Sequence, residues 1–283
     1  YTAAPDTKSR VVTVNGGYIK GGANYRANDN SNFFFNVGQI MRPPSFDGVF
    51  PNADYDFEEA DEILNESFTS FELGYGFRSS NFKGTINAYH TVWGDRTLRR
   101  STSIDDQGVR IIYSGVEQTH QGVEAEMTWY PSSRLRVKGM ASLGDWKYTK
   151  NFQGDAYFID NNQPAGTTGT LYLDGVKIGD AAQTVLYVGL DYKLSSKLSV
   201  DVDMMSFDNL HGRFGPLDSE FNSANNRGSI KLPSWGTTDL GATYRFTLLG
   251  YETRARLNIN NLFDKEYLSQ SQTNFHNDGG RTW

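Results

Sequence analysis

The sequence predicts an all-β protein whose antiparallel strands cross a membrane as a β-barrel. Three observations support this prediction: polar and apolar residues alternate over long segments, these segments exceed ordinary strands in length, and their connections alternate between short and long. The mean hydropathy is −0.56, and no apolar run reaches the roughly 20 residues that a membrane helix needs. Crossing by helices is therefore excluded, whereas barrel strands face lipid only at alternate residues and give a weak hydropathy signal.

The alternation is clearest in the segments 134–143, 197–204 and 254–260. Apolar residues such as Val137 and Val202 fall on one face of each segment and charged residues on the other, because successive side chains of a strand point in opposite directions. We expect ten strands on this basis. They cover roughly 15–27, 32–41, 67–78, 82–99, 108–130, 134–149, 183–194, 197–210, 233–248 and 251–268.

The connections predict which strand ends face the cell exterior. Tight turns are expected at 28–31, 79–81, 131–133, 195–196 and 249–250. Long loops rich in Gly, Asn and Asp are expected at 42–66, 150–182, 211–232 and 269–280, with a shorter loop at 100–107. Short periplasmic turns and long external loops are typical of outer-membrane barrels, whereas a soluble sandwich has no reason to segregate its loops by length.

Aromatic residues gather toward the ends of the expected strands. Trp93, Trp129, Trp146 and Tyr244 are examples. Rings in these places are typical of aromatic girdles at a lipid–water boundary. The alternative, ordinary core aromatics of a soluble β-domain, would not require strands longer than the about 5–6 residues that are usual in globular proteins.

Four short motifs resemble the TonB-dependent receptors of Gram-negative outer membranes. The segment 261–267 (NLFDKEY) is similar to the family's NLFD..Y segment near the C-terminus, and 42–46 (RPPSF) is similar to its mid-barrel R.P.F segment. The segment 71–75 (FELGY) resembles the family's E.G strand, and 122–124 (GVE) resembles the G.E strand that precedes a periplasmic turn. Each motif is weak alone, and their order and spacing make the resemblance specific.

The resemblance implies a barrel of about 22 strands that is filled by an N-terminal plug. On this reading residues 1–283 are the C-terminal part of one transmembrane barrel domain, and the plug and the early strands lie outside them. We expect an eleventh strand to begin at Arg281 and to be cut off after Trp283. The segments 21–25 (GGANY) and 95–98 (DRTL) look most like receptors of the Bacteroides and Flavobacterium group.

The resemblance also implies a function. Such a receptor captures a scarce nutrient at the surface of the bacterial outer membrane and imports it into the periplasm with energy supplied by TonB. The nutrient is left open among ferric siderophores, haem, cobalamin, glycans and peptides. The implied partners are the TonB complex, which acts through the plug, outer-membrane lipid and the small nutrient ligand, and a surface lipoprotein is left open.

Three other functions remain as alternatives. A passive porin would lack the plug and would select solutes with a charged constriction. An outer-membrane hydrolase would need a Ser/His/carboxylate constellation. An adhesin would bind a partner without any uptake. The resemblance itself implies neither an enzymatic activity nor a cofactor.

Two sets of residues are candidates for contacts within the barrel. Aromatic residues in or near the long loops, with one histidine, would surround a captured ligand; they are Trp146, Tyr148, Tyr157, Phe158, Tyr172, Phe214, Phe221, Phe275 and His276. Charged residues on the polar parity of their strands would line the lumen; they are Arg134, Arg136, Lys138, Asp201, Asp203, Arg254 and Arg256. The ordinary alternative for the first set is packing among the loops. For the second set, the ordinary role is to hydrogen-bond the plug or to line the water-filled wall, and the functional alternative is that some of these residues contact passing substrate.

The composition argues against other kinds of site. The chain has no cysteine, which removes the common zinc and iron–sulfur frameworks. Its four histidines, His90, His120, His211 and His276, have no metal-ligand spacing, so no metal site is predicted. The formal net charge of −6 gives no basic footprint for nucleic acid.

Overall fold

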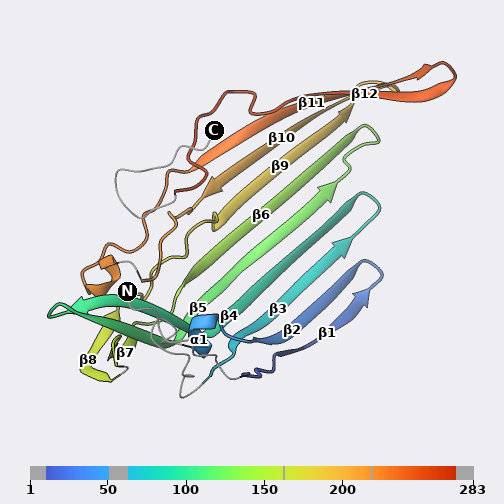
Figure 1. Ribbon diagram of the computed structural model, residues 1–283. Helices are drawn as coiled ribbons and strands as arrows, with labels where there is room; N and C mark the ends of the chain where they lie inside the picture. Colours follow the sequence, from blue (N-terminus) through green and yellow to red (C-terminus); the bar gives the residue numbers. More distant parts are fainter. Residues whose placement is uncertain (1–10, 51–62, 162, 218, 272–283) are drawn as a thin grey trace.

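The computed structural model describes residues 11–50, 63–161, 163–217 and 219–271, and within them one antiparallel sheet of twelve strands. The strands are β1 (Gly17–Asn28), β2 (Ser31–Arg42), β3 (Glu66–Arg78), β4 (Phe82–Ile104), β5 (Gln107–Trp129), β6 (Leu135–Tyr148), β7 (Phe152–Phe158), β8 (Pro164–Leu171), β9 (Thr184–Lys193), β10 (Leu198–Asp208), β11 (Trp235–Leu248) and β12 (Tyr251–Ile259). Ten of them lie side by side in the order β1-β2-β3-β4-β5-β6-β9-β10-β11-β12 (Figure 1). Among the described residues β1 and β12 do not pair with each other, so the sheet is open.

The ten strands expected from the alternation are confirmed as this main path. The loop expected at 150–182 is partly wrong, because it contains the β7–β8 hairpin. Proline and several glycines make this stretch resemble a loop, whereas β7 is held by pairing with the outer part of β5. A pairing with a distant strand is not visible in the local sequence pattern.

Two strand ends also differ from expectation. The loop expected at 100–107 is a tight turn, because β4 continues to Ile104 and only Asp105 and Asp106 connect it to β5. Their φ angles of 50° and 61° suit a two-residue hairpin turn, and aspartate tolerates this left-handed backbone. The last strand ends at Ile259 rather than at 268, and Asn261 has a φ of 49° where the chain leaves the sheet. The strand expected at 281–283 lies outside the described residues.

The five expected tight turns and the long loops lie at opposite ends of the sheet, as expected, and the two-residue β4–β5 turn lies at the end of the long loops. The turns of the β1–β2, β3–β4, β5–β6, β9–β10 and β11–β12 pairs share one end, and the loops after β2, β6 and β10 share the other (Figure 1). Pro131 and Gly166 therefore lie at opposite ends. The short turns are closed locally; for example, the Ser195 hydroxyl oxygen accepts a hydrogen bond of 3.0 Å from the backbone N–H of Leu198.

The strand register gives the sheet one apolar face and one polar face. Across β6, β9, β10, β11 and β12 one row consists of Leu135, Tyr192, Val200, Ala242 and Leu257. One residue further along β6, Arg136 pairs with Asp191 on the opposite face. The apolar face is exposed, with Leu257 at 65% and Val188 at 46%. An exposed face of this composition fits contact with lipid. We refer to it as the outer face and to the polar face as the inner face.

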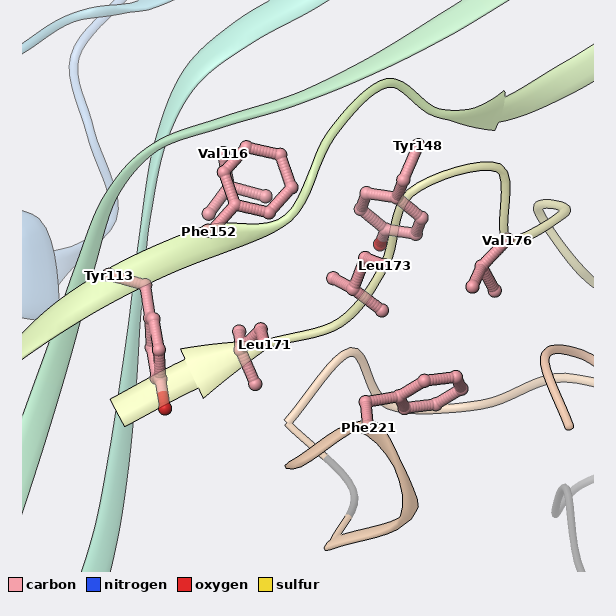
Figure 2. Close-up of a cluster of buried hydrophobic side chains, with 8 residues drawn as sticks. All are labelled: Tyr113, Val116, Tyr148, Phe152, Leu171, Leu173, Val176 and Phe221. Carbon is pink, nitrogen blue, oxygen red and sulfur yellow. The ribbon is translucent and has the colours of Figure 1, made fainter. Parts of the chain in front are cut away.

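The buried hydrophobic core lies among the long connections, at the end of the sheet that we call the rim. Its members come from the rim end of β5, the end of β6, the β7–β8 hairpin, the following loop and the 3-10 helix η1 (Ser219–Asn222). This rim cluster consists of Tyr113, Val116, Tyr148, Phe152, Leu171, Leu173, Val176 and Phe221 (Figure 2). The helix α1 (Phe46–Val49) lies against β4 nearby. In the part of the chain that the structure describes, no helix is long and apolar enough to span a membrane.

Candidate functional site: the inner face and the rim

The inner face carries a network of ion pairs across β6, β9 and β10. Arg136 donates two hydrogen bonds of 2.9 Å to the Asp191 carboxylate. Lys138 Nζ lies 3.3 Å from Asp191 and 3.8 Å from the carboxylate of Asp203, which also accepts a hydrogen bond from the Tyr187 hydroxyl. The register therefore brings Arg136 and Lys138 to Asp191, which the sequence did not single out, and links Lys138 to Asp203.

A second ion pair crosses β11. Arg256 of β12 donates hydrogen bonds of 2.9 and 2.8 Å to the two carboxylate oxygens of Asp201 on β10, and one of 3.0 Å to Thr243 Oγ1. The two side chains meet above Gly241, where an added Cβ would lie only 2.2 Å from Asp201 Oδ2. A glycine in the intervening strand is therefore what allows the pair to form.

Two of the expected wall residues stand apart from these networks. Arg134 lies in the turn before β6 and is exposed. Arg254 on β12 is exposed and lies opposite Arg245 of β11 in the register. Two like charges that face each other across strands repel, so this end of β12 needs water or another protein segment nearby.

Beside the short turns the inner face is hollowed. A cavity of about 810 Å³ opens there against β1 to β6 and β9. Its lining includes Arg26, Arg78, Lys83, Glu126 and Lys138. A cavity with so many charged groups suits water or a polar protein segment rather than an apolar molecule.

Nearer the rim, the inner face carries aromatic rings beside two arginines. Trp93 of β4 stacks on Phe68 of β3, with ring centroids 4.9 Å apart. The guanidinium of Arg96 lies 4.0 Å and that of Arg42 5.7 Å from the centre of the Trp93 ring. Glu66 pairs with Arg42 and accepts a hydrogen bond of 3.1 Å from the Trp93 indole. Cation–π contacts and this carboxylate fix the Trp93 side chain.

From Arg96 a chain of hydrogen bonds and ring contacts runs across three strands. Arg96 donates to Gln118 Oε1 at 3.2 Å, so the amide nitrogen of Gln118 faces His120 Nε2, 2.9 Å away. An amide N–H₂ can only donate, so His120 Nε2 accepts and the imidazole is neutral, with its proton on Nδ1. The His120 ring lies 5.4 Å from that of Trp146, whose indole N–H donates to the Tyr89 hydroxyl at 2.8 Å.

The side chains of Tyr89 and Trp146 lie along the wall because glycines stand beneath them. A Cβ at Gly122 would lie 2.8 Å from the Tyr89 hydroxyl, and one at Gly144 would lie 2.8 Å from the Trp146 indole nitrogen. The backbone of Trp146 is held by the buried Gln183, whose side chain accepts from its N–H at 2.9 Å and donates to its carbonyl at 3.1 Å. Gln183 thus replaces a strand partner just before β9 begins.

The nine aromatic candidates do not lie together in one site. Trp146 belongs to the inner face, as the register with His120 shows. Tyr148 and Phe221 are buried in the rim cluster, with exposures of 5% and 0%. Phe214 packs against the cluster, with its ring 4.9 Å from that of Phe221.

The other candidates lie around the rim or outside the described residues. Tyr172 is partly buried, and its backbone N–H donates to the Phe221 carbonyl at 2.7 Å. Tyr157 and Phe158 are partly buried on β7, with the Arg110 guanidinium 5.7 Å from the centre of the Tyr157 ring. The remaining two, Phe275 and His276, fall outside the described residues.

Among the described residues, no group of three or more His, Asp or Glu side chains is arranged to hold a metal ion.

The chain was also compared with known proteins. Residues 6–262 match the family model described as "TonB dependent receptor-like, beta-barrel". The chain belongs to the TonB-dependent receptor family. A separate comparison with curated proteins gave no match.

Solved structures show a similar fold. The chain resembles BauA, the ferric preacinetobactin receptor from Acinetobacter baumannii, with a TM-score of 0.60 and 17% identity over 88% of this chain and 32% of that one. It resembles the ferric-catecholate import receptor Fiu from K12 E. coli, with a TM-score of 0.59 and 15% identity over 89% and 31%. The copper transporter OprC gives a TM-score of 0.59 and 15% identity over 90% and 35%. The chain thus spans about a third of the length of these structures.

The receptor motif at 261–267 has a structural role in this chain. The side chain of Asp239 accepts a hydrogen bond of 2.7 Å from the backbone N–H of Asn261, and the Asn261 side chain bonds the backbone of Lys265. The chain then returns to the sheet, where the Tyr267 ring stacks on Trp235 with centroids 3.9 Å apart. The motif therefore anchors the chain where it leaves β12.

Proposed function

We propose that the intact protein is an outer-membrane receptor that captures a nutrient at the cell surface and imports it into the periplasm with energy from TonB. The observation that carries this proposal is the two-faced sheet of a TonB-dependent receptor chain. Its outer face is apolar and exposed, and its inner face holds the ion pairs of Arg136 and Arg256. A wall of this kind separates lipid from a polar lumen.

The partners follow from the same proposal. TonB would act on the intact receptor through a plug inside the barrel, and the charged inner face would contact that plug or water. Lipid would cover the outer face. A small nutrient would be the ligand, and a surface lipoprotein is a further proposed partner. Proteins with this fold include a ferric preacinetobactin receptor, a ferric-catecholate import receptor and a copper transporter, which shows that the fold accepts different ligands. We also propose a source in the Bacteroides and Flavobacterium group, supported by the segments 21–25 and 95–98.

The proposed roles of the candidate residues divide by location. Arg136, Lys138, Asp203 and the Asp201–Arg256 pair would organise the lumen wall, and Arg134 and Arg254 would contact water or the plug. Among the aromatic candidates, Trp146 has the best position for a passing ligand because it is half-buried on the inner face. Tyr148 and Phe221 would support the rim from within the rim cluster, and their burial makes direct ligand contact unfavourable.

Uptake assays on the intact receptor test the proposal. Cells that carry it should accumulate a labelled nutrient only when TonB is present and the inner membrane is energised. A candidate nutrient would first be found by growth on limiting iron, cobalamin or defined glycans. Uptake that persists without TonB would point to a passive porin, and a receptor that binds at the surface without any uptake would point to an adhesin.

A further inference from the structure

Toward the rim, the inner face carries two aromatic rings beside neutral hydrogen-bonding groups. Tyr89 and Trp146 are half-buried, lie along the wall above glycines and are joined edge to edge by a hydrogen bond of 2.8 Å. Next to them are the neutral imidazole of His120 and the amide of Gln118, 2.9 Å apart. The polar edges of the two rings bond each other, and both side chains lie against the wall. A ligand in the lumen can therefore contact the ring faces that point away from the wall.

The charges around these rings disfavour an anion. Arg96 on this part of the wall is already stacked on Trp93 and bonded to Gln118. On the side of the rings that faces the short turns, Glu124 and Glu126 also point to the inner face, as their pairing with Ser142 and Met140 of β6 shows. The two carboxylates on this face would therefore repel an anionic ligand.

The same groups match a polyhydroxylated ring. The C–H face of a sugar is apolar and stacks on aromatic rings, whereas its rim of hydroxyls both donates and accepts hydrogen bonds. Ser142 Oγ donates to only one oxygen of Glu124, at 3.3 Å, and a carboxylate has about four acceptor positions. Glu124 can therefore accept hydrogen bonds from ligand hydroxyls.

We propose that Tyr89, Trp146, His120 and Glu124 form a subsite of the lumen wall that binds a neutral sugar ring, so that the ligand of this receptor is an oligosaccharide. The proposal rests on the proposed function, because it takes the ligand to pass through the lumen. Gln183, which fixes the backbone of Trp146 by two hydrogen bonds, is the positioning residue of this subsite.

Binding by the purified intact receptor tests the proposal. The receptor in detergent is first applied to an array of neutral and uronic-acid oligosaccharides and, separately, to a set of ferric siderophores. Affinity for the best neutral oligosaccharide is then measured calorimetrically for the wild type, Trp146→Leu, Trp146→Phe and the control Phe34→Leu. Phe34 is another inner-face ring that lies over a glycine, Gly74, but it belongs to β2 and lies away from the proposed subsite.

The proposal predicts neutral oligosaccharide binding that is about tenfold weaker in Trp146→Leu, which loses the ring face. Trp146→Phe keeps a ring and should stay within about threefold of the wild type, and Phe34→Leu should not change affinity. Binding of only ferric or acidic ligands, no oligosaccharide binding by the wild type, or equal affinity of Trp146→Leu and Phe34→Leu would each overturn the proposal. TonB-dependent uptake of a different ligand would then leave the proposed function intact, whereas oligosaccharide binding without energy-dependent uptake would refute that function alone.

Discussion

An arginine at Val202 should destabilise the folded barrel strongly, because Val202 lies at the centre of the apolar face of β10. On this strand the outer-face positions run from Leu198 to Ser206, with Val202 midway. Eight residues at about 3.3 Å each cover roughly 26 Å along the strand. With a tilt of about 40° the vertical height is roughly 20 Å, close to the roughly 25 Å apolar band of such barrels.

The expected cost follows from this depth. An arginine on the lipid face near the midplane costs about 2–4 kcal/mol, and near the interface about 0–1 kcal/mol. Val202→Arg should therefore lower the folding equilibrium constant by roughly 30-fold to several-hundred-fold. Ser206→Arg, on the same face but near the rim, is the control for depth. Met205→Arg, on the inner face of the same strand, is the control for side-chain size and charge.

The assay is urea unfolding of the intact receptor in lipid vesicles, followed by tryptophan fluorescence and by heat-dependent gel mobility. The free energy of unfolding of Val202→Arg should be well below that of Ser206→Arg. Met205→Arg should remain within about 1 kcal/mol of the wild type, since a polar lumen accepts a charge. A Val202→Arg variant as stable as the wild type, or more stable than Met205→Arg, would mean that the two faces of the sheet were assigned the wrong way round.

Four further outcomes are expected. Phe221→Ala should remove about 3–5 kcal/mol from the local stability of the rim; hydrogen exchange should accelerate in β8 and η1 but not in β9 to β12, and uniform acceleration would contradict an independent rim cluster. Arg256→Ala should cost about 1.5–3 kcal/mol because it leaves the Asp201 carboxylate, which is 9% exposed, without its partner; pairing it with Asp201→Asn should recover part of that loss, and additive losses would contradict a coupled pair. Burial lowers the pKa of His211 below its usual 6.5, so the loop after β10 should keep its stability above that pH and lose it as the pH falls below about 6.5, where the unfolded chain takes up the proton first; exchange protection there that is equal at pH 7.5 and 5.5 would refute this. Gln183→Leu should leave the barrel folded but should broaden the NMR signal of the Trp146 indole, because the Trp146 backbone is no longer held. An unchanged indole signal would show that Gln183 does not position Trp146.

The alternation along the chain was sufficient to predict the membrane-facing strands. Whether Leu135 and Arg136 fall on opposite faces depends only on the period of two within one strand. The placement of the expected tight turns at one end and the long loops at the other also follows from the local sequence. In a sheet of consecutive antiparallel strands, successive connections alternate between the two ends. The motif at 261–267 indicated the family, although its role as an anchor for Tyr267 on Trp235 became visible only in the structure.

The candidate site depended on register and packing, which no local pattern contains. Asp191 was not singled out from the sequence, and it became the centre of the ion-pair network only because β9 aligns it with Arg136. Likewise, the subsite joins Tyr89, His120 and Trp146 from three strands, and the glycines that make room for the rings lie on neighbouring positions of β5 and β6.

The rim is where sequence reasoning was least informative. Loop aromatics such as Tyr148 and Phe221 look alike in the sequence whether they contact a ligand or pack together, and burial alone decided that these two pack in the rim cluster. Strand identity and facing are set by each residue's immediate neighbours, so the sequence by itself determined them. Pairing partners, side-chain networks and loop packing depend on residues dozens of positions apart, whose contacts are chosen by the free energy of the whole fold, and only the tertiary structure decided them.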